Sequence, residues 1–510
     1  MSQVLAIDGN RLTLGDLEGV ARDGRRVALD PVARDRVERA RKVVDDAVAK
    51  GAVVYGVTTG FGSFADVVIP RDRLRELQEN LVRSHSAGVG EVLDEPETRG
   101  LMLLRANVLA KAYSGVRVET LELLIAMLNA RLHPVVPSQG SVGASGDLAP
   151  LAHLALAMIG EGSCRYQGRV SAGAEGLKAA GLTPVRLEAK EGIALINGTQ
   201  LMTAVAGLAL AEAERLAATA DVAGALTLDA LKGTDVAFDE RIHAARPHPG
   251  QAVSARNLRR LLASSPLRES HRDCGKVQDA YSLRCIPQVH GAARDALGYV
   301  KATVGIELNG ATDNPMVFVD TAELLSGGNF HGEPVAIAAD VLAIAVAEIG
   351  SISERRIERL VNPALSGLPA FLARDGGFRS GLMMAQVTAA ALASENKSLA
   401  HPASVDSIPT SANKEDHVSM GVTAARKAAR AVANTRRILA IELLAACQAL
   451  DFHRPLQTSP PLEAVHRRVR GLASFYDDGR PLGPDIESVA ELVGAGTIVV
   501  EAASVCGTLE

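Results

Sequence analysis

The chain has 510 residues and a formal net charge of −5, with 54 Lys and Arg against 59 Asp and Glu. Hydrophobic residues make up 47% and charged residues 22%, as in ordinary soluble globular proteins. The basic residues form no stripe, which argues against a nucleic-acid partner. The first twenty residues lack a basic segment followed by an apolar run, and charged residues interrupt the long apolar stretches, so we expect no signal peptide and no membrane span.

Cysteine usage indicates the redox compartment. The five cysteines are odd in number, contain no CxxC pair and show no spacing typical of a zinc site. They predict reduced thiols, a cytoplasmic protein and no metal.

Helical periodicity changes along the chain. Residues 1 to about 196 alternate short helical stretches with Gly-bearing loops, whereas Ala- and Leu-rich stretches with apolar residues three and four apart follow. The long stretches are 199–233, 288–310, 334–360 and 419–450. Because strand-like alternation is scarce, we predict an all-α fold with a mixed, mainly helical N-terminal domain (1–196) and a central long-helix bundle with a C-terminal extension (197–510).

The first motif, YGVTTGFGS at 55–63, is a glycine-bearing loop that begins at Tyr55. No strand, Lys or Ser/Thr follows in the order of a phosphate-binding loop, so this loop has little support as a phosphate cradle. Tyr55 is either a candidate proton-transfer group or a loop aromatic that packs inward.

The second motif, GSVGASGDLAP at 140–150, can form an electrophile. If the Gly146 nitrogen attacks the Ala144 carbonyl, whose oxygen leaves as water, and Ser145 then loses a second water, the backbone closes into a 4-methylidene-imidazol-5-one (MIO) ring. Neighbouring glycines tolerate the positive φ that this closure needs. The alternative is a Gly/Ser loop that caps the helix starting near Asp147.

These motifs, together with the segments named below, resemble the aromatic amino acid lyase family, which comprises the histidine, phenylalanine and tyrosine ammonia-lyases and related aminomutases. The resemblance runs from about Tyr55 to Cys447 and is greatest to the histidine-directed members. It implies a fumarase/aspartase-like helical bundle and a homotetramer whose active sites each draw residues from three subunits. It also implies an MIO group formed autocatalytically from Ala144, Ser145 and Gly146, with no dissociable cofactor.

The resemblance assigns catalytic roles position by position. Tyr55 matches the base that removes the β-proton. Asn197, in KEGIALINGTQ, matches a donor to the prosthetic group's oxygen, although an Asn there could also cap the helix from Thr199, and both roles could hold. In the segment 277–285, Gln278 is assigned to substrate binding, Tyr281 to a place beside the prosthetic group, and Arg284 to the substrate carboxylate. Tyr281 and Arg284 are three residues apart, so they share a face if this segment is helical.

Other positions indicate substrate choice. His85, in the Ser84-His85 pair, offers a hydrogen-bonding partner to an imidazole, but tyrosine-directed relatives also carry His there. Glu415, in the segment 404–420, matches the carboxylate of histidine-directed members, where other members usually have Gln. Phe330, in SGGNFHGE, matches a pocket-lining residue.

One position departs from the family pattern. Lys414 occupies a position that is usually Gln, and its cation could pair with the Glu415 carboxylate or point away. Nearby acidic and histidine side chains show no metal-ligand spacing, and we expect them to make structural hydrogen bonds. They are His401, Asp406, Asp416 and His417.

We therefore expect the non-oxidative deamination of L-histidine to trans-urocanate and ammonia. The alternatives are an MIO-dependent 2,3-aminomutase, a tyrosine ammonia-lyase and a non-catalytic binding relative. A cofactor-free lyase of the fumarase and aspartase kind has little support, because its GSxxMPxKxN loop is missing from the sequence.

Overall fold

The computed structural model describes residues 4–510, so the first three residues of the predicted N-terminal domain lie outside the described part. The chain forms two compact units. The first contains Met1–Leu208, Lys301–Asp340 and Pro402–Arg426, and the second contains Ala209–Val300, Val341–His401 and Lys427–Glu510. Each unit is assembled from three segments that are apart in the sequence. The two domains expected from the sequence, 1–196 and 197–510, stay a prediction.

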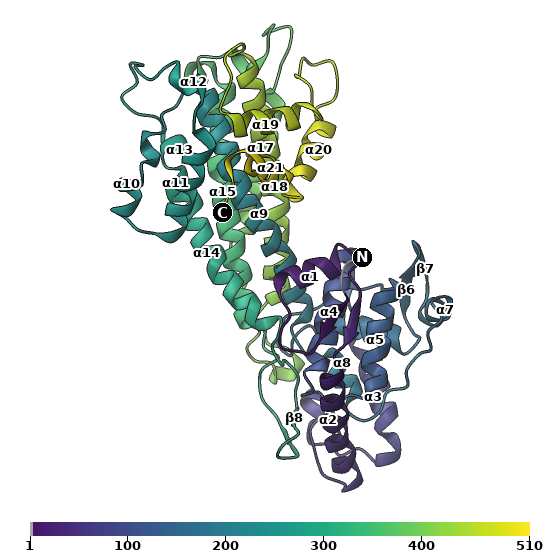
Figure 1. Cartoon of the computed structure of the whole chain (residues 1–510). Helices are drawn as coiled ribbons and strands as arrows, with labels where there is room; N and C mark the ends of the chain where they lie inside the picture. Colours follow the sequence, from purple (N-terminus) through teal and green to yellow (C-terminus); the bar gives the residue numbers. More distant parts are fainter. Residues whose placement is uncertain (1–3) are drawn as a thin grey trace. The chain divides into compact units, whose positions relative to one another are not determined.

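The first unit is mainly helical and holds the short strands (Figure 1). Its α-helices are α1 (Leu14–Ala21), α2 (Pro31–Ala49), α3 (Leu74–His85), α4 (Glu95–Ala110), α5 (Val118–Ala130), α6 (Leu148–Met158), α7 (Gly173–Ala179) and α8 (Glu191–Ile196). Its 3-10 helices are η1 (Gly62–Phe64), η2 (Arg71–Arg73) and η5 (Ser411–Asn413).

The strands pair in small sheets. They are β1 (Leu5–Ile7), β2 (Val27–Leu29), β3 (Val89–Val92), β4 (His133–Pro134), β5 (Pro137–Gln139), β6 (Ser163–Tyr166), β7 (Arg169–Ala172), β8 (Met316–Phe318) and β9 (Glu323–Leu325). The pair β1–β2 is parallel, whereas β3–β5, β4–β6–β7 and β8–β9 are antiparallel. The β3–β5 pair leads into the loop that carries Ala144, Ser145 and Gly146.

The second unit consists of helices. Four long helices begin in one unit and end in the other: α9 (Gln200–Ala230), α14 (Ile286–Glu307), α15 (Glu333–Val361) and α18 (Gly421–Asp451). The remaining α-helices are α10 (Glu240–Ala244), α11 (Pro249–Leu262), α12 (Pro266–Glu269), α13 (Tyr281–Arg284), α16 (Pro363–Ser366), α17 (Met383–Leu399), α19 (Pro460–Arg470), α20 (Gly483–Gly494) and α21 (Thr497–Cys506). The 3-10 helices are η3 (Val236–Phe238) and η4 (Ala370–Leu372).

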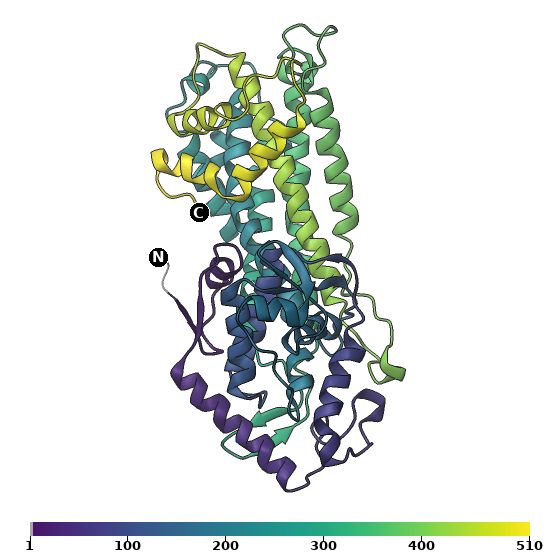
Figure 2. The same ribbon diagram turned by 90° about the vertical axis from the view of Figure 1, so that its right-hand side faces the viewer.

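Buried polar contacts join the long helices within the second unit. The Glu442 carboxylate on α18 accepts hydrogen bonds from Thr227 on α9 and from Ser353 and Arg356 on α15. The Thr435 hydroxyl on α18 donates to a carbonyl of α15, and α17 contacts the same hydroxyl. In Figure 2 the green helices α15 and α17 and the yellow-green helix α18 lie side by side. The predicted long-helix, mainly α-helical fold is confirmed.

One described helix, α15, has the length and apolar composition of a membrane span, and α20 with α21 qualifies as a pair bent by 61°. However, 67% of the most apolar stretch of α15 is buried inside the protein, as is typical of core helices.

Candidate active site

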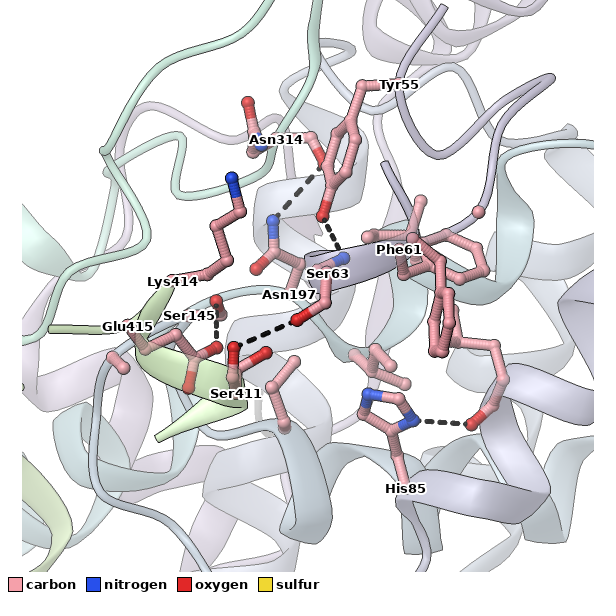
Figure 3. A pocket seen from close by; sticks show the side chains of 18 of the residues that line it. Tyr55, Phe61, Ser63, His85, Ser145, Asn197, Asn314, Ser411, Lys414 and Glu415 are labelled. Carbon is pink, nitrogen blue, oxygen red and sulfur yellow. Dashed lines mark hydrogen bonds between the residues drawn. The ribbon is translucent and has the colours of Figure 1, made fainter. Parts of the chain in front are cut away.

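A cavity of about 1210 Å³ in the first unit gathers predicted site residues that are far apart in the sequence (Figure 3). Those that line it are Tyr55, His85, Ala144, Ser145, Asn197, Phe330 and Glu415. They come from the loop before η1, the end of α3, the loop before α6, the end of α8, the segment before α15 and the turn at η5.

The loop at 140–147 is held in a conformation that requires glycine. Gly143 and Gly146 have φ of +67° and +75°, and a Cβ on Gly146 would lie 2.2 Å from the Gly198 carbonyl oxygen. The Gly143 carbonyl accepts hydrogen bonds from the Ser419 hydroxyl (2.9 Å) and the Gly332 N–H (3.1 Å). The loop is therefore fixed by contacts on both sides.

The Asn197 side chain lies between this loop and residue 314. When its amide is oriented to satisfy both neighbours, Nδ2 donates to the Ser145 carbonyl oxygen at 2.8 Å and Oδ1 accepts from the Asn314 N–H at 2.9 Å. Asn197 is 2% exposed. The alternative reading, in which Asn197 caps the helix from Thr199, is wrong, because its side chain points elsewhere.

Asp147 is the residue that caps α9. Its Oδ2 accepts from the Leu201 and Met202 N–H groups at 2.8 and 3.0 Å, and its Oδ1 accepts from the Ser141 hydroxyl. Complete burial raises its pKa to about 7, against the opposing effect of these hydrogen bonds. The cap thus joins the start of α9 to the residue that follows Gly146. The alternative role for the 140–150 loop was to cap the helix that starts near Asp147, which is α6. The Asp147 side chain does cap a helix, but that helix is α9.

These residues fit an MIO group. Closure of the ring between Ala144 and Gly146 leaves the Ser145 carbonyl as the ring oxygen, which is the atom that Asn197 meets. The glycine conformations fit a compressed backbone, and Gly146 lies too close to Gly198 for any side chain. The Ser145 hydroxyl, which would leave as water when the methylidene group forms, faces the cavity and donates to the Glu415 carboxylate at 2.9 Å.

Tyr55 lies at the cavity wall in a loop that contacts the η5 turn. Its hydroxyl accepts from the Gly62 N–H at 3.3 Å, and its ring meets Phe61 edge-on. The Ser63 hydroxyl donates to the Ser411 carbonyl at 3.1 Å, which joins this loop to the turn that carries Glu415. Tyr55 therefore faces the cavity rather than packing only inward.

His85 has a defined hydrogen-bonding direction. Its Nδ1 lies 2.9 Å from the Leu81 carbonyl, so Nδ1 carries the proton and donates to that oxygen. Burial lowers its pKa, which favours the neutral ring. The Nε2 of a neutral ring with this tautomer is an acceptor, so His85 offers the cavity a lone pair for an N–H or O–H donor.

Glu415 projects from a tight turn. Ser411, Ala412 and Asn413 all have positive φ, and the backbones of Thr410 and Glu415 bond to each other across the turn. The Thr410 hydroxyl also donates to the Glu415 carboxylate. Such left-handed stretches without glycine are strained and cluster at functional sites.

Lys414 lines the same cavity and is exposed to solvent within it. No ion pair joins Lys414 to Glu415 among the described residues, and the two side chains diverge in Figure 3. Of the two options left open by the sequence, pairing and pointing away, the structure has the second.

Phe330 lies in the cavity wall beside His331, whose ring stacks on His417. The His331 Nε2 donates to the His417 carbonyl, so this histidine makes a structural hydrogen bond. No group of three or more His, Cys, Asp or Glu suited to a metal occurs within residues 4–510.

Three assigned residues lie in the second unit. Gln278 and Tyr281 are exposed, and the Arg284 guanidinium lies over the Tyr281 ring at 4.6 Å on α13, as the three-residue spacing predicted. The Arg284 Nε is buried without a hydrogen-bond partner. None of the three is among the described residues that line the cavity with Ser145.

Sequence reasoning missed a set of buried polar residues around Asn197. Arg105 contacts the Asn197 carbonyl, and the half-buried Asn314 contacts its side chain. Asp313 contacts Asn314, and Lys190 contacts Asp313. Lys190 lies within the KEGIALINGTQ segment, but its partner is 123 residues away, so no local signal reveals the pair.

A known family and several known proteins match most of the chain. The aromatic amino acid lyase family matches residues 12–471. A histidine ammonia-lyase from Koribacter versatilis is 57% identical, over 98% of this chain and 99% of its own. The crystal structure of a histidine ammonia-lyase from Trypanosoma cruzi is 46% identical, with a TM-score of 0.92 over 98% of this chain and 95% of its own. A tyrosine aminomutase from Streptomyces globisporus is 39% identical, with a TM-score of 0.93 over 98% of each chain.

Proposed function

The chain belongs to the aromatic amino acid lyase family, and we propose that it deaminates L-histidine to trans-urocanate and ammonia. The observation that carries this proposal is the placement of Ser145 in one cavity with His85 and Glu415, beneath the Asn197 amide. The similarity to histidine ammonia-lyases over nearly the full chain supports the same substrate.

The chemistry requires an electrophile, because an amine leaves poorly and the β-hydrogen is scarcely acidic. The MIO group, formed from Ala144, Ser145 and Gly146, supplies an electrophilic carbon that no ordinary side chain offers. The Asn197 Nδ2 is placed to stabilise negative charge at the Ser145 carbonyl oxygen, as donors in an oxyanion hole do.

The cavity residues then divide the remaining tasks. The His85 Nε2 accepts a hydrogen bond from the N–H of the substrate imidazole, because the His85 Nδ1–H already donates to the Leu81 carbonyl. Glu415 holds or exchanges a proton at the other imidazole nitrogen, which a neutral amide cannot do. Tyr55 removes the β-proton, and Phe330 contacts the ring.

The remaining assigned residues come from other copies of the chain. We propose a homotetramer in which Gln278, Tyr281 and Arg284 of neighbouring subunits complete each cavity. The Arg284 fork suits a carboxylate, and its buried, unpartnered Nε is consistent with a ligand that arrives on assembly. We also propose that the protein is soluble and cytoplasmic and acts in the first step of histidine degradation.

The test is ultraviolet monitoring of the purified protein with L-histidine, L-tyrosine and L-phenylalanine in parallel. We expect urocanate from histidine and little product from the other two. Coumarate or cinnamate without urocanate would overturn the substrate assignment.

A second candidate, a 2,3-aminomutase, is favoured by the similarity to a tyrosine aminomutase across 98% of the chain. Chromatography of the same reactions for β-amino acids separates the two, because a lyase yields none.

A further inference from the structure

A layer of buried charge lies behind the Asn197 amide. The Lys190 and Asp313 side chains form an ion pair at 2.9 Å with no exposed surface, and Arg105 is also fully buried. None of these side chains lines the cavity within the described chain, so none contacts the substrate directly there.

The ion pair reaches Asn197 through one intermediate residue. Lys190 Nζ donates to Asp313 Oδ2, and Asp313 Oδ1 accepts from the Asn314 N–H at 2.7 Å. The same N–H donates to Asn197 Oδ1 at 2.9 Å.

This contact decides which end of the amide meets the Ser145 carbonyl. A carboxamide has one acceptor end and one donor end. With Oδ1 held by the Asn314 N–H, Nδ2 must face the opposite way, and there it lies 2.8 Å from the Ser145 carbonyl oxygen. If Asn314 shifted, the Asn197 Oδ1 would lose its hydrogen-bond donor. The amide would then be free to rotate and bring Oδ1 against the Ser145 carbonyl oxygen, and two acceptor oxygens repel each other.

Arg105 fixes the backbone on the other side. Its guanidinium donates to the Ala194 and Asn197 carbonyls at 2.8 and 2.9 Å. It also contacts Gln200, whose side chain donates to Thr312 at 2.9 Å, just before Asp313. The two buried cations and Asp313 therefore belong to one connected layer beneath Asn197.

We propose that Lys190 and Asp313 are positioning residues for the reaction: they fix Asn314 and thereby aim the Asn197 amide at the Ser145 carbonyl. This inference rests on the proposed function. A contribution to protein stability does not explain why this ion pair is buried, because apolar residues of similar volume often stabilise the folded protein equally well or better. Aiming a donor at developing charge is a stronger one, since loss of one such donor costs on the order of 10²–10³ in kcat.

The test replaces the pair without leaving a lone charge. We expect Lys190→Met/Asp313→Leu to fold and to retain the near-ultraviolet band of the prosthetic group, while kcat falls roughly 10- to 100-fold and KM changes little. In Lys190→Met/Asp313→Asn the amide oxygen can again accept from the Asn314 N–H, so kcat should recover in part. The control is Arg356→Met/Glu442→Leu, an equally buried pair in the second unit, which should keep kcat near the wild-type value.

A double-mutant cycle with Asn197→Ala separates positioning from a general structural effect. If the pair acts through Asn197, adding Lys190→Met/Asp313→Leu to Asn197→Ala lowers kcat no further. Losses that multiply, or a kcat equal to that of the wild type in Lys190→Met/Asp313→Leu, would overturn the inference. If the first variant does not fold, the Met/Asn variant enters the cycle in its place.

The assay of the wild-type protein distinguishes failure of the inference about Lys190 and Asp313 from failure of the proposed function. Wild-type protein that turns over L-tyrosine or L-phenylalanine instead of L-histidine would contradict the substrate assignment alone. The cycle is then measured with that substrate, because Asn197 meets the Ser145 carbonyl and not the substrate side chain.

Discussion

In the uncyclised chain the Ser145 hydroxyl donates to the Glu415 carboxylate, and it leaves as water when the methylidene group forms. We expect Ser145→Ala to abolish both the near-ultraviolet band and urocanate formation. Ultraviolet spectra and the urocanate assay measure the two effects, with Ser171→Ala in strand β7 as the control. Full activity in Ser145→Ala would rule out the electrophile.

The Glu415 carboxylate tests the choice of substrate. Glu415→Gln keeps the size of the side chain and an oxygen that can accept from Thr410, but an amide cannot hold a transferred proton. We therefore expect kcat/KM for L-histidine to fall about 10²-fold or more, as for loss of a general acid–base group. Steady-state kinetics with L-histidine measure this effect. An unchanged kcat/KM would remove Glu415 from the imidazole end of the site.

Single residues were predictable from the sequence where a motif carried them. Ser145, Asn197 and Glu415 lie in recognisable segments, and the structure gathers them in one cavity. Sequence reasoning could not decide between the two readings of Asn197, because Asp147 takes over the capping of α9 from 54 residues away. The Lys190–Asp313 pair was unpredictable for the same physical reason, since its members meet only in the folded chain.

At the scale of elements, residues 145–147 pack tightly against residues 197–199, where Gly146 and Gly198 form a parallel β-bridge. Gly198 has φ of +149°, and a Cβ there would lie 2.4 Å from Arg105 Nη2 and 2.6 Å from Thr312 Oγ1. We expect Gly198→Ala to lower the unfolding free energy by several kcal/mol, because the Arg105 and Thr312 side chains that it meets are held by buried hydrogen bonds that would have to break. We also expect it to impair formation of the prosthetic group. Thermal unfolding and the near-ultraviolet band measure the two effects.

The matched control for this substitution is Gly168→Ala. Gly168 also has positive φ (+79°), but nothing lies within 4 Å of its added Cβ. Conformational strain alone should then cost about 1–2 kcal/mol, with the band intact. Equal losses in the two variants would mean that the tight packing around Gly198 tolerates a side chain.

The Asp147 cap gives a pH dependence whose sign follows from burial. Its pKa is raised to about 7 in the folded protein from an ordinary value of 3.8. Between about pH 4 and pH 7, the native state therefore holds a proton on Asp147 that the unfolded state has lost. This contribution to stability is complete below about pH 4 and declines as pH rises through 7, by up to about 1.4 kcal/mol per pH unit.

We expect Asp147→Asn to remove this slope, because an Asn oxygen can still accept from the Leu201 and Met202 N–H groups. Thermal unfolding between pH 5 and pH 8 measures it: the Tm of the variant, relative to wild type, should increase with pH. The exposed Asp320→Asn is the control. A Tm difference that is constant with pH would show that Asp147 does not titrate in this range.

Elements were predictable where their periodicity is long. The stretches 199–233 and 419–450 correspond to α9 and α18 within a few residues of each end, because sustained spacing of apolar residues leaves little choice of structure. The strands of two to four residues were not predicted individually, since so short a run carries no period. The left-handed turn at 411–413 was also invisible, because it contains no glycine.

For the whole molecule, the chain order conceals the compact units. Each unit takes segments from three separated parts of the sequence, so a single linear boundary cannot describe both. The assignment of site residues to different subunits came only from the family resemblance. Local patterns of residues contain no information on which copy of a chain supplies them.

That assignment can be tested by complementation. Tyr55 lines the cavity in the first unit, whereas Arg284 lies in the second unit and is not among its described lining residues. Tyr55→Phe and Arg284→Ala should each be nearly inactive alone. If each site takes Tyr55 and Arg284 from different subunits, equal co-expression of the two variants produces some sites with both native residues, about a quarter for random assembly of a symmetric oligomer.

We therefore expect tagged, co-purified mixed oligomers to recover about a quarter of the wild-type activity toward L-histidine, by the same random-assembly argument. The two variants mixed after separate purification, without exchange of subunits, are the control and should stay inactive. If both residues of a site came from one chain, every chain in the mixed oligomer would carry one defect, and co-expression would restore nothing. Absence of recovery in oligomers shown to contain both variants would thus place Tyr55 and Arg284 of each site in the same chain.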